Sequence, residues 1–247
     1  MAKLIPVKQI TSWSFSRYLD YKLCPFKAKL KHVDKIKEPG NAAMDRGAAI
    51  HNLCEDYIKG KIGRLPAELK LFKDEFAKLR KVFKKVSESM VVEDNWAFTK
   101  DWTETAWNDW VGCWVRIKLD CAHHEQGDVM VVTDWKTGKF NSQYNEDYIE
   151  QLELYALSAL LLHPHLRAVK PRLAYVDHGT VFPEPGSKDE EEMTFTQKDV
   201  PKLKKIWGVR TKAMMNDKKF APRPNNKCQW CFYRSANKAA GGGQCKF

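Results

Sequence analysis

The stretch Val129-Met130-Val131-Val132-Thr133-Asp134-Trp135-Lys136 decides the expected fold of this chain. Its apolar run predicts a strand, and strand side chains alternate between the two faces of a sheet, so Asp134 and Lys136 emerge together. As a mere exposed ion pair, they would contribute only about 0–1 kcal/mol to stability. An acid beside an ammonium at a strand end can instead hold a divalent cation and position a water. Lys136 is then expected to orient or help deprotonate that water and to stabilise charge on a phosphate.

A second acid is expected to join this pair through a hairpin. The strand-like run 115–119 ends at Asp120, and residues 123–128 predict a turn before the stretch quoted above. The hairpin brings Asp120 close to Asp134. Because hard cations prefer oxygen ligands, we expect these two carboxylates to bind Mg²⁺ or Mn²⁺, with the Trp135 backbone carbonyl as a further ligand. Such a site suits metal-assisted phosphodiester hydrolysis.

Composition narrows the class of protein. The chain has 247 residues and a formal charge of +11, from 42 Lys+Arg against 31 Asp+Glu. This charge favours a polyanionic partner such as nucleic acid, although a generally solvated basic surface has the same composition. No apolar stretch is long enough to span a bilayer, and residues 1–6 lack the apolar core of a signal peptide. We therefore expect a cytoplasmic protein without a membrane partner.

The order of the predicted elements indicates an α/β protein with a mixed central sheet flanked by helices. We expect a single domain over 1–247, with a helical part (1–90), a sheet core (91–180) and a C-terminal helix with a Cys-rich tail (181–247). The predicted helices are 12–32 with a bend at Pro25, 42–59, one beginning after Pro66, 146–162 and 197–216. The predicted strands are 91–98, 113–121, 128–136 and 173–176, and the acidic run 188–192 is expected to be a solvated loop.

The seven cysteines suggest a second metal site. Disulfides are not expected in a reducing compartment. Cys228 and Cys231 have the two-residue spacing of one corner of a metal site, and Cys24 and Cys245 could complete four thiolates. The other three cysteines, Cys54, Cys113 and Cys121, are expected to be small core residues.

Five motifs together resemble the PD-(D/E)xK nuclease superfamily, in particular its RecB-type exonuclease branch. This branch includes the CRISPR-associated adaptation exonucleases and the nuclease domains of recombination helicase-nucleases. The motif that contains Asp134 and Lys136 matches closely. Lys118 stands where the family often has glycine, two residues before the first acid, Asp120. The motifs are Ser14-Phe15-Ser16-Arg17-Tyr18…Cys24-Pro25, Arg46-Gly47-Ala48-Ala49-Ile50-His51…Glu55, Leu119-Asp120, Thr133-Asp134-Trp135-Lys136-Thr137-Gly138 and Gln151-Leu152-x-Leu154-Tyr155-Ala156.

The resemblance implies further residues of the active site. It makes His51 a metal ligand, although a lone histidine in a helix is usually structural. Glu93 is either a strand-edge charge or a metal- or water-linked acid. Gln151 and Tyr155 are four apart and project from one helix face. Ordinary packing explains them, but the resemblance implies that they line the site, contacting the scissile phosphate or holding the lysine.

The resemblance also implies a restriction-endonuclease-like fold and a [4Fe–4S] cluster bound by one early and three late cysteines. The gap before Cys245 is longer than in the family, so zinc or no metal stays an alternative. The implied function is a metal-dependent DNA exonuclease on single-stranded ends, acting with recombination or replication proteins in a prokaryotic or phage-infected cell. The alternatives are a structure-specific or RNA-directed endonuclease and a non-catalytic DNA-binding subunit.

Overall fold

A computed structural model describes residues 9–87, 90–141, 143 and 145–247. Residues 1–6, which we expected to lack a signal-peptide core, lie outside this description. The chain divides into two compact units. We call Asn41–Ile206 the sheet unit, and Met1–Gly40 together with Trp207–Phe247 the terminal unit. The single domain expected over 1–247 stays a prediction.

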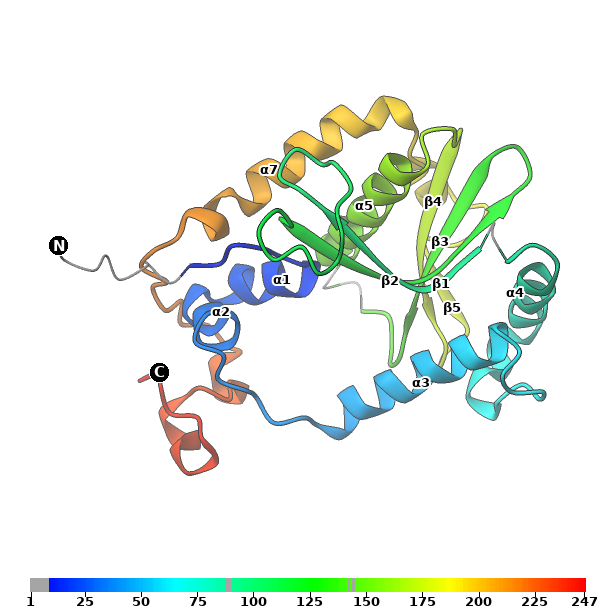
Figure 1. Cartoon of the computed structure of the whole chain (residues 1–247). Coiled ribbons are helices and arrows are strands. Elements are labelled where there is room, and N and C mark those ends of the chain that lie inside the picture. The colour runs from blue at the N-terminus through cyan, green and yellow to red at the C-terminus, as the bar shows by residue number, and fades with distance from the viewer. Residues whose placement is uncertain (1–8, 88–89, 142, 144) are drawn as a thin grey trace. The chain divides into compact units, whose positions relative to one another are not determined.

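The sheet unit is built on a five-stranded sheet in the order β1-β2-β3-β4-β5 (Figure 1). The pair β3–β4 is parallel and the other pairs are antiparallel. The parallel pair is joined by α5 (Asn145–Leu162), because parallel neighbours need a crossover connection. The predicted mixed α/β sheet is thus confirmed. Its strands are β1 (Met90–Phe98), β2 (Val115–Glu125), β3 (Val129–Lys136), β4 (Ala168–Tyr175) and β5 (Thr180–Phe182).

The predicted hairpin of β2 and β3 is present, but its turn is shorter than expected. His123, His124 and Glu125, which we placed in the turn, pair with β3 in the ladder. The chain reverses instead at Gly127 and Asp128, which have φ values of +73° and +56°. Glycine and aspartate tolerate this left-handed region better than most residues, so the reversal needs few residues.

Helices cover both faces of the sheet. On one face, α3 (Ala42–Ile58), η1 (Ala67–Phe72) and α4 (Lys73–Lys85) form an apolar core with the sheet. In this core the ring of Phe76 stacks on Trp135 with centroids 4.8 Å apart. Tyr155 of α5 contacts Asp134, the residue before Trp135. Because neighbouring strand residues point to opposite faces, α5 covers the other face.

The acidic run 188–192 corrects one prediction, since it forms the short helix α6 (Lys188–Glu192) rather than a loop. The hydroxyl of Ser187 caps it by accepting a hydrogen bond from Glu190 N. Acidic residues in the first turn also interact favourably with the helix dipole. The helix expected over 197–216 is present as η4 (Gln197–Asp199) followed by α7 (Val200–Asn216).

The terminal unit begins with α1 (Phe15–Leu23) and α2 (Pro25–His32), which meet at Cys24 as the proline predicts. Its C-terminal part contains η5 (Cys228–Trp230) and η6 (Ser235–Ala240). The buried rings of Trp13 and Trp207 stack with centroids 5.1 Å apart and join the two ends of the chain. Within the described residues, no helix has the length and apolarity needed to cross a bilayer.

Candidate active site

The β2–β3 hairpin brings Asp120, Asp134 and Lys136 together. The ladder pairs Cys121 with Thr133, so the next position along places Asp134 opposite Asp120. Asp120 Oδ2 accepts a hydrogen bond from Trp135 N at 2.8 Å. Lys136 Nζ lies 2.6 Å from Asp134 Oδ2. Both carboxylates are 5% exposed, so two acids and an amine share one partly enclosed point.

Two further side chains complete this acidic cluster from other elements. His51 of α3 places Nδ1 3.1 Å from Asp120 Oδ1 and 3.6 Å from Glu93 Oε1. One ligand atom from each of His51, Glu93 and Asp120 lies within 4.8 Å of the others. Glu93 has a φ of +54° inside β1. Non-glycine residues held in this region are enriched at functional sites, where the surrounding structure compensates the strain.

The charges of this cluster are strongly coupled. Burial alone lowers the pKa of His51, but the carboxylates of Asp120 and Glu93 outweigh it and raise the pKa to about 10. Burial and the neighbouring Asp134 raise the pKa of Asp120. Burial also acts to raise the pKa of Glu93, but His51 and Lys118 outweigh it and lower the pKa. A metal that binds the His51 imidazole must therefore displace a proton from it.

Two residues of α5 hold Asp134, the acid on β3. Tyr155 Oη donates a hydrogen bond to Asp134 Oδ1 at 2.5 Å. Gln151 Nε2 donates to Tyr155 Oη at 3.0 Å and to Asp134 Oδ1 at 3.3 Å. Burial, followed by the nearby carboxylates, raises the pKa of Tyr155 well above its usual value, so the phenol stays a donor. The two residues therefore contact an acid rather than Lys136.

The residues of the cluster fit Mg²⁺ or Mn²⁺. They offer carboxylate oxygens, which hard cations prefer, and one imidazole, which suits Mn²⁺. Among the described residues, the buried Asp134 Oδ2 has an ion-pair partner in Lys136 but no aligned hydrogen-bond donor. A lone pair on this oxygen is thus available to a cation. The Trp135 carbonyl stays a predicted ligand.

The structure adds residues that sequence reasoning missed. Lys118 Nζ lies 2.7 Å from Glu93 Oε2, and its place two residues before Asp120 on β2 was the available signal. The Arg46 guanidinium makes two hydrogen bonds to Asp177, at 2.8 and 2.6 Å. Asp177 also accepts from Gly138 N at 2.9 Å, which fixes the loop after Lys136. Arg46 and Asp177 lie 131 residues apart, so no local sequence pattern predicted their interaction.

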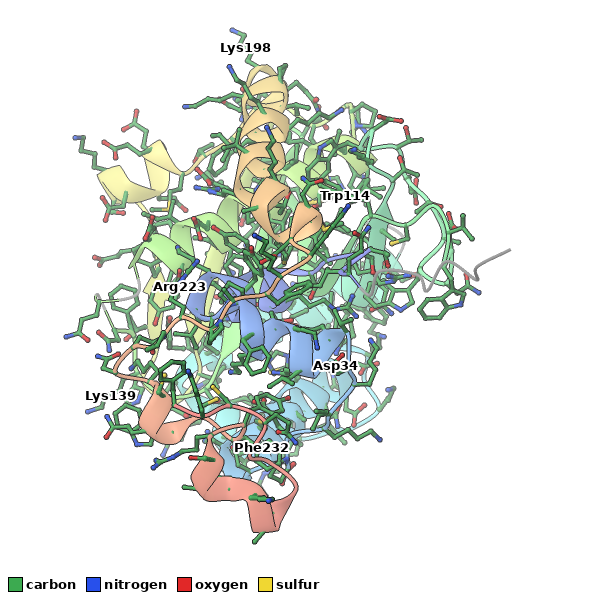
Figure 2. The ribbon with its side chains drawn as sticks, turned by 90° about the vertical axis from the view of Figure 1, so that its left-hand side faces the viewer. Asp34, Trp114, Lys139, Lys198, Arg223 and Phe232 are labelled. Atoms are coloured by element: carbon green, nitrogen blue, oxygen red, sulfur yellow. The ribbon has the colours of Figure 1, made fainter. Side chains whose placement is uncertain are left out.

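The proposed cysteine ligands are only partly gathered within the terminal unit. Cys24 Sγ accepts a hydrogen bond from Arg223 N at 3.4 Å, and Cys228 Sγ accepts one from Asn225 N at 3.3 Å. Arg223 is labelled in Figure 2. Burial raises the pKa of Cys231, with smaller effects that include the nearby Cys245. In the described part of the chain, no three of the four sulfurs lie within 4.8 Å of one another, so the fit of a cluster or zinc is incomplete.

Two aromatic residues beside these cysteines differ in exposure. Trp230 is 70% exposed, but Tyr233 is fully buried. Tyr233 donates its hydroxyl hydrogen to Ile36 O at 2.8 Å and contacts the ring of Phe232 at 5.3 Å. Tyr233 is therefore a packing residue and does not present a face for stacking on bases.

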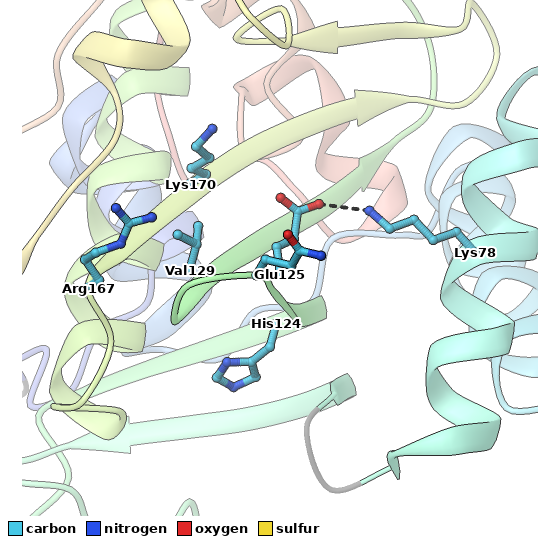
Figure 3. A pocket seen from close by; sticks show the side chains of 7 residues that line it. Lys78, His124, Glu125, Val129, Arg167 and Lys170 are labelled. Carbon is cyan, nitrogen blue, oxygen red and sulfur yellow. Dashed lines mark hydrogen bonds and ion pairs between the residues drawn. The ribbon is translucent and has the colours of Figure 1, made fainter.

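A separate polar pocket of about 810 Å³ lies at the β2–β3 turn (Figure 3). Its lysines already have acidic partners. Lys78 Nζ is 2.9 Å from Glu125 Oε1, and Lys170 Nζ is 3.4 Å from Glu190 Oε2. Glu125 lies five positions after Asp120, roughly 17 Å along β2. The pocket is thus distinct from the acidic cluster.

Comparison with known proteins identifies the family. Residues 12–236 match the PD-(D/E)XK nuclease superfamily. The solved structure of the protein SSO0001 is 12% identical, covers 93% of this chain and 87% of its own, and has a TM-score of 0.41. A "putative exonuclease" from Eubacterium rectale is 13% identical, covers 90% and 86%, and has a TM-score of 0.48. No curated protein matches the sequence. The match over residues 12–236 shows that this chain belongs to the PD-(D/E)XK nuclease superfamily.

Proposed function

We propose that this nuclease is a metal-dependent deoxyribonuclease of the RecB-type branch that digests DNA from single-stranded ends. The observation that carries the proposal is the acidic cluster: His51, Glu93 and Asp120 have ligand atoms within 4.8 Å of one another. Asp134 and Lys136 belong to the same cluster, with Lys136 Nζ 2.6 Å from the Asp134 carboxylate. Oxygen and imidazole donors next to an amine support hydrolysis of a phosphodiester with Mg²⁺ or Mn²⁺.

The cation would be held by Asp120, Asp134 and His51, with Glu93 either as a ligand or through a water. When bound, it supplies Lewis acidity and lowers the pKa of water. Among the described residues, Asp120 keeps its orientation through Trp135 N, which donates to Oδ2. The ladder therefore fixes this ligand before any cation arrives, which is the preorganisation that efficient sites need.

Lys136 has the position of the group that handles the nucleophile. Its ammonium can orient an attacking water and stabilise negative charge on the phosphate oxygens in the transition state. The carboxylate of Asp134 holds the ammonium at 2.6 Å, so the amine cannot turn away into solvent without losing this ion pair. Tyr155 and Gln151 in turn hold that carboxylate. The water oxygen bonds to phosphorus as the P–O bond to the leaving oxygen breaks. The water gives up one proton and the leaving oxygen takes one up, so no covalent intermediate with the protein forms.

The test is cleavage of end-labelled single-stranded DNA by matched variants. We expect Asp134→Ala and Lys136→Ala each to lower the cleavage rate by on the order of 10³-fold or more, because several kcal/mol of transition-state stabilisation are lost. Binding of DNA in EDTA should stay close to that of the wild type. Lys139→Ala is the matched control, since Lys139 is an exposed lysine three residues further along the same segment. Wild-type turnover by either active-site variant would refute the assignment.

Covalently closed single-stranded circles separate the exonuclease from the endonuclease alternatives. An exonuclease leaves circles intact while it degrades the linear form of the same sequence. Nicking of circles at a comparable rate would favour a structure-specific endonuclease, and preference for RNA of the same sequence would favour an RNA-directed one. A non-catalytic subunit would cleave none of these substrates with Mg²⁺ or Mn²⁺.

A further inference from the structure

The loop between β1 and β2, residues 99–114, presents apolar side chains to solvent. Val111 is 98% exposed, Trp110 is 80% exposed and Trp107 is 37% exposed. The base of the same loop is buried, with Trp102 at 7% and Cys113 at 5% exposure. Single exposed apolar residues need no explanation, but a group that contains two tryptophans indicates an interaction surface.

The tip of this loop has a defined conformation. Asp109 Oδ1 accepts hydrogen bonds from Gly112 N at 2.7 Å and Val111 N at 3.1 Å. Its Oδ2 accepts one from Thr105 Oγ1 at 2.7 Å. A Cβ atom at Gly112 would lie 2.4 Å from Asp109 Oδ2, so only glycine fits this turn without a shift. The backbone around Trp110 is therefore held in place by the loop itself.

Arg116, the second residue of β2, supports the two exposed rings. Its guanidinium lies 4.9 Å from the ring centroid of Trp110 and 5.8 Å from that of Trp107. Its Nε donates a hydrogen bond to Trp107 O at 2.9 Å. Arginine over an indole is a favourable cation–π contact. At 80% exposure, Trp110 still offers most of its ring surface to a ligand.

A line of polar side chains along β2 connects this platform with the acidic cluster. Alternation places Arg116, Lys118 and Asp120 on the same face of the strand. Asp120 lies four positions after Arg116, which corresponds to about 13 Å along the strand. Between them, the Lys118 side chain is 62% exposed and its Nζ contacts Glu93 at 2.7 Å. Figure 1 shows the loop at the end of β2 that lies away from the β2–β3 turn.

We propose that Trp110 and Trp107 form a stacking platform for the bases of single-stranded nucleic acid, whose backbone then follows Arg116 and Lys118 to Asp120. The inference rests on the proposed nuclease function and deepens it by naming where the strand outside the scissile bond binds. At a stacked rise of about 3.4 Å per nucleotide, the 13 Å line spans roughly four nucleotides. Stacking accepts any base, which suits an enzyme that digests without sequence preference.

The charges of the loop favour this arrangement of bases and phosphates. Its exposed acids, Asp101 and Glu104, lie in the first half, near the turn closed by Thr99 and Thr103. They would repel phosphates at that end of the loop. Lys100 lies in the same half of the loop, and the carboxylate of Asp109 beside Trp110 accepts hydrogen bonds from within the loop. Arg116 and Lys118 lie along β2 towards Asp120, so phosphates are favoured on this line and the uncharged bases at the tryptophans. A single strand exposes its bases for such stacking, whereas a duplex does not.

The test is binding of a fluorescein-labelled 12-nucleotide oligothymidylate in EDTA, followed by anisotropy. Loss of one base stack of 1–3 kcal/mol corresponds to roughly a 5- to 150-fold change, so we expect Trp110→Ala to raise Kd by about ten-fold. Trp110→Phe should recover most of the affinity. Leu71→Ala, which removes an apolar side chain of 52% exposure elsewhere in the sheet unit, should bind like the wild type.

Salt dependence separates stacking from charge. Lys118→Gln should reduce the slope of log Kd against log salt by about 0.7, because one phosphate contact on a single strand is lost. Trp110→Ala should leave this slope unchanged. Wild-type affinity of both Trp110→Ala and Trp107→Ala would overturn the platform. Wild-type affinity accompanied by loss of self-association in sedimentation would assign the surface to a protein interface and overturn it equally.

A second measurement distinguishes failure of the platform from failure of the nuclease function. Wild-type protein is assayed on bis(p-nitrophenyl) phosphate, a diester without nucleobases, and on linear single-stranded DNA with Mn²⁺. If neither is hydrolysed but Trp110→Ala still weakens binding, the platform stands and the catalytic proposal fails. If both are hydrolysed and Trp110→Ala binds like the wild type, the platform alone fails.

Discussion

The acidic cluster of the sheet unit and the cysteines of the terminal unit hold their potential metal ligands in different ways. His51, Glu93 and Asp120 come from three separate elements, yet their ligand atoms lie within 4.8 Å of one another. Among the described residues, no three sulfurs of the four cysteines proposed as ligands lie so close together. Both sets offer chemically suitable donors. The difference lies in the backbone that carries them.

Backbone ladders explain this difference. Asp120 and Asp134 belong to paired strands, whose register is fixed by main-chain hydrogen bonds and by burial of one face. The late cysteines lie on or beside a short 3-10 turn, with Cys245 tied through a single bridge to Arg234. A site on a ladder keeps its geometry without metal, whereas a site on turns gains its geometry from the metal that it binds.

The largest effect should come from the acidic cluster, whose two aspartates lie on paired strands. We expect Asp120→Asn to lower cleavage of single-stranded DNA by on the order of 10³-fold, because several kcal/mol of metal-dependent stabilisation are lost. Far-UV circular dichroism should be unchanged, since the ladder does not depend on the carboxylate. Mn²⁺ should raise the melting temperature of the wild type but not of the variant. Asp128→Asn, at the exposed turn of the same hairpin, is the matched control.

Changes to the cysteine site of the terminal unit should affect the stability of the protein rather than its rate of DNA cleavage. If the thiolates bind a cluster or zinc, Cys228→Ser should release it and cost about 3 kcal/mol, or roughly 6–12 °C in melting temperature. We expect this loss, measured together with iron and zinc content after anaerobic purification. Cys113→Ser, at a buried cysteine of the sheet unit, controls for the exchange itself. Unchanged melting and no bound metal would remove the cysteine site.

Some features of this molecule follow from local sequence patterns, whereas others depend on residues far apart in the chain. The hairpin and the convergence of Asp120 with Asp134 follow from strand alternation over a short stretch. The resemblance places Gln151 and Tyr155 at the active site, but neither it nor helical spacing predicted the hydrogen bond from Tyr155 to Asp134. The clamp between Arg46 and Asp177 joins residues far apart in the chain and leaves no periodic signal.

The misassigned segments have local physical reasons. The run 188–192 is strongly charged, which resembles a solvated loop, but Ser187 caps it and Lys188 pairs with Glu192 at 3.0 Å. His123 and Glu125 are polar, which resembles a turn, but the ladder continues through them until Gly127. For the cysteines, spacing identifies suitable ligands without specifying how far apart their sulfur atoms lie.

A smaller effect should come from the residues that orient the acids. Tyr155→Phe removes the hydrogen bond to Asp134 Oδ1 while it keeps the ring. Loss of such a partner of a metal ligand typically costs 10- to 100-fold in activity or metal affinity. We expect this range in cleavage rate, with a higher Mn²⁺ concentration for half-maximal activity. Tyr57→Phe, on α3 in the apolar core, is the matched control. An unchanged Mn²⁺ requirement would mean that the ladder alone orients Asp134.

The smallest expected effect is on the pH dependence of stability. It comes from His123, whose surroundings in the sheet unit are opposite to those of His51. His51 faces carboxylates, which raise its pKa to about 10. His123 is 2% exposed, and burial, aided by Arg172 and Lys78, lowers its pKa to about 4. The carboxylate of Glu125 lies 3.8 Å from its Nε2, too far for a hydrogen bond.

The pH dependence of stability follows from this lowered pKa. Between about pH 6.5 and pH 4 the unfolded chain binds a proton at His123 that the folded chain does not, so acidification destabilises the fold. From pH 7.5 to pH 5.5 this contribution is about 1 kcal/mol. Urea unfolding of His123→Gln should therefore lose about 1 kcal/mol less over that range than the wild type. His178→Gln, at an exposed turn, is the matched exchange. Equal losses in the wild type and His123→Gln would mean that water or a neighbouring acid stabilises the charged imidazole of His123, as the carboxylates of Asp120 and Glu93 stabilise that of His51.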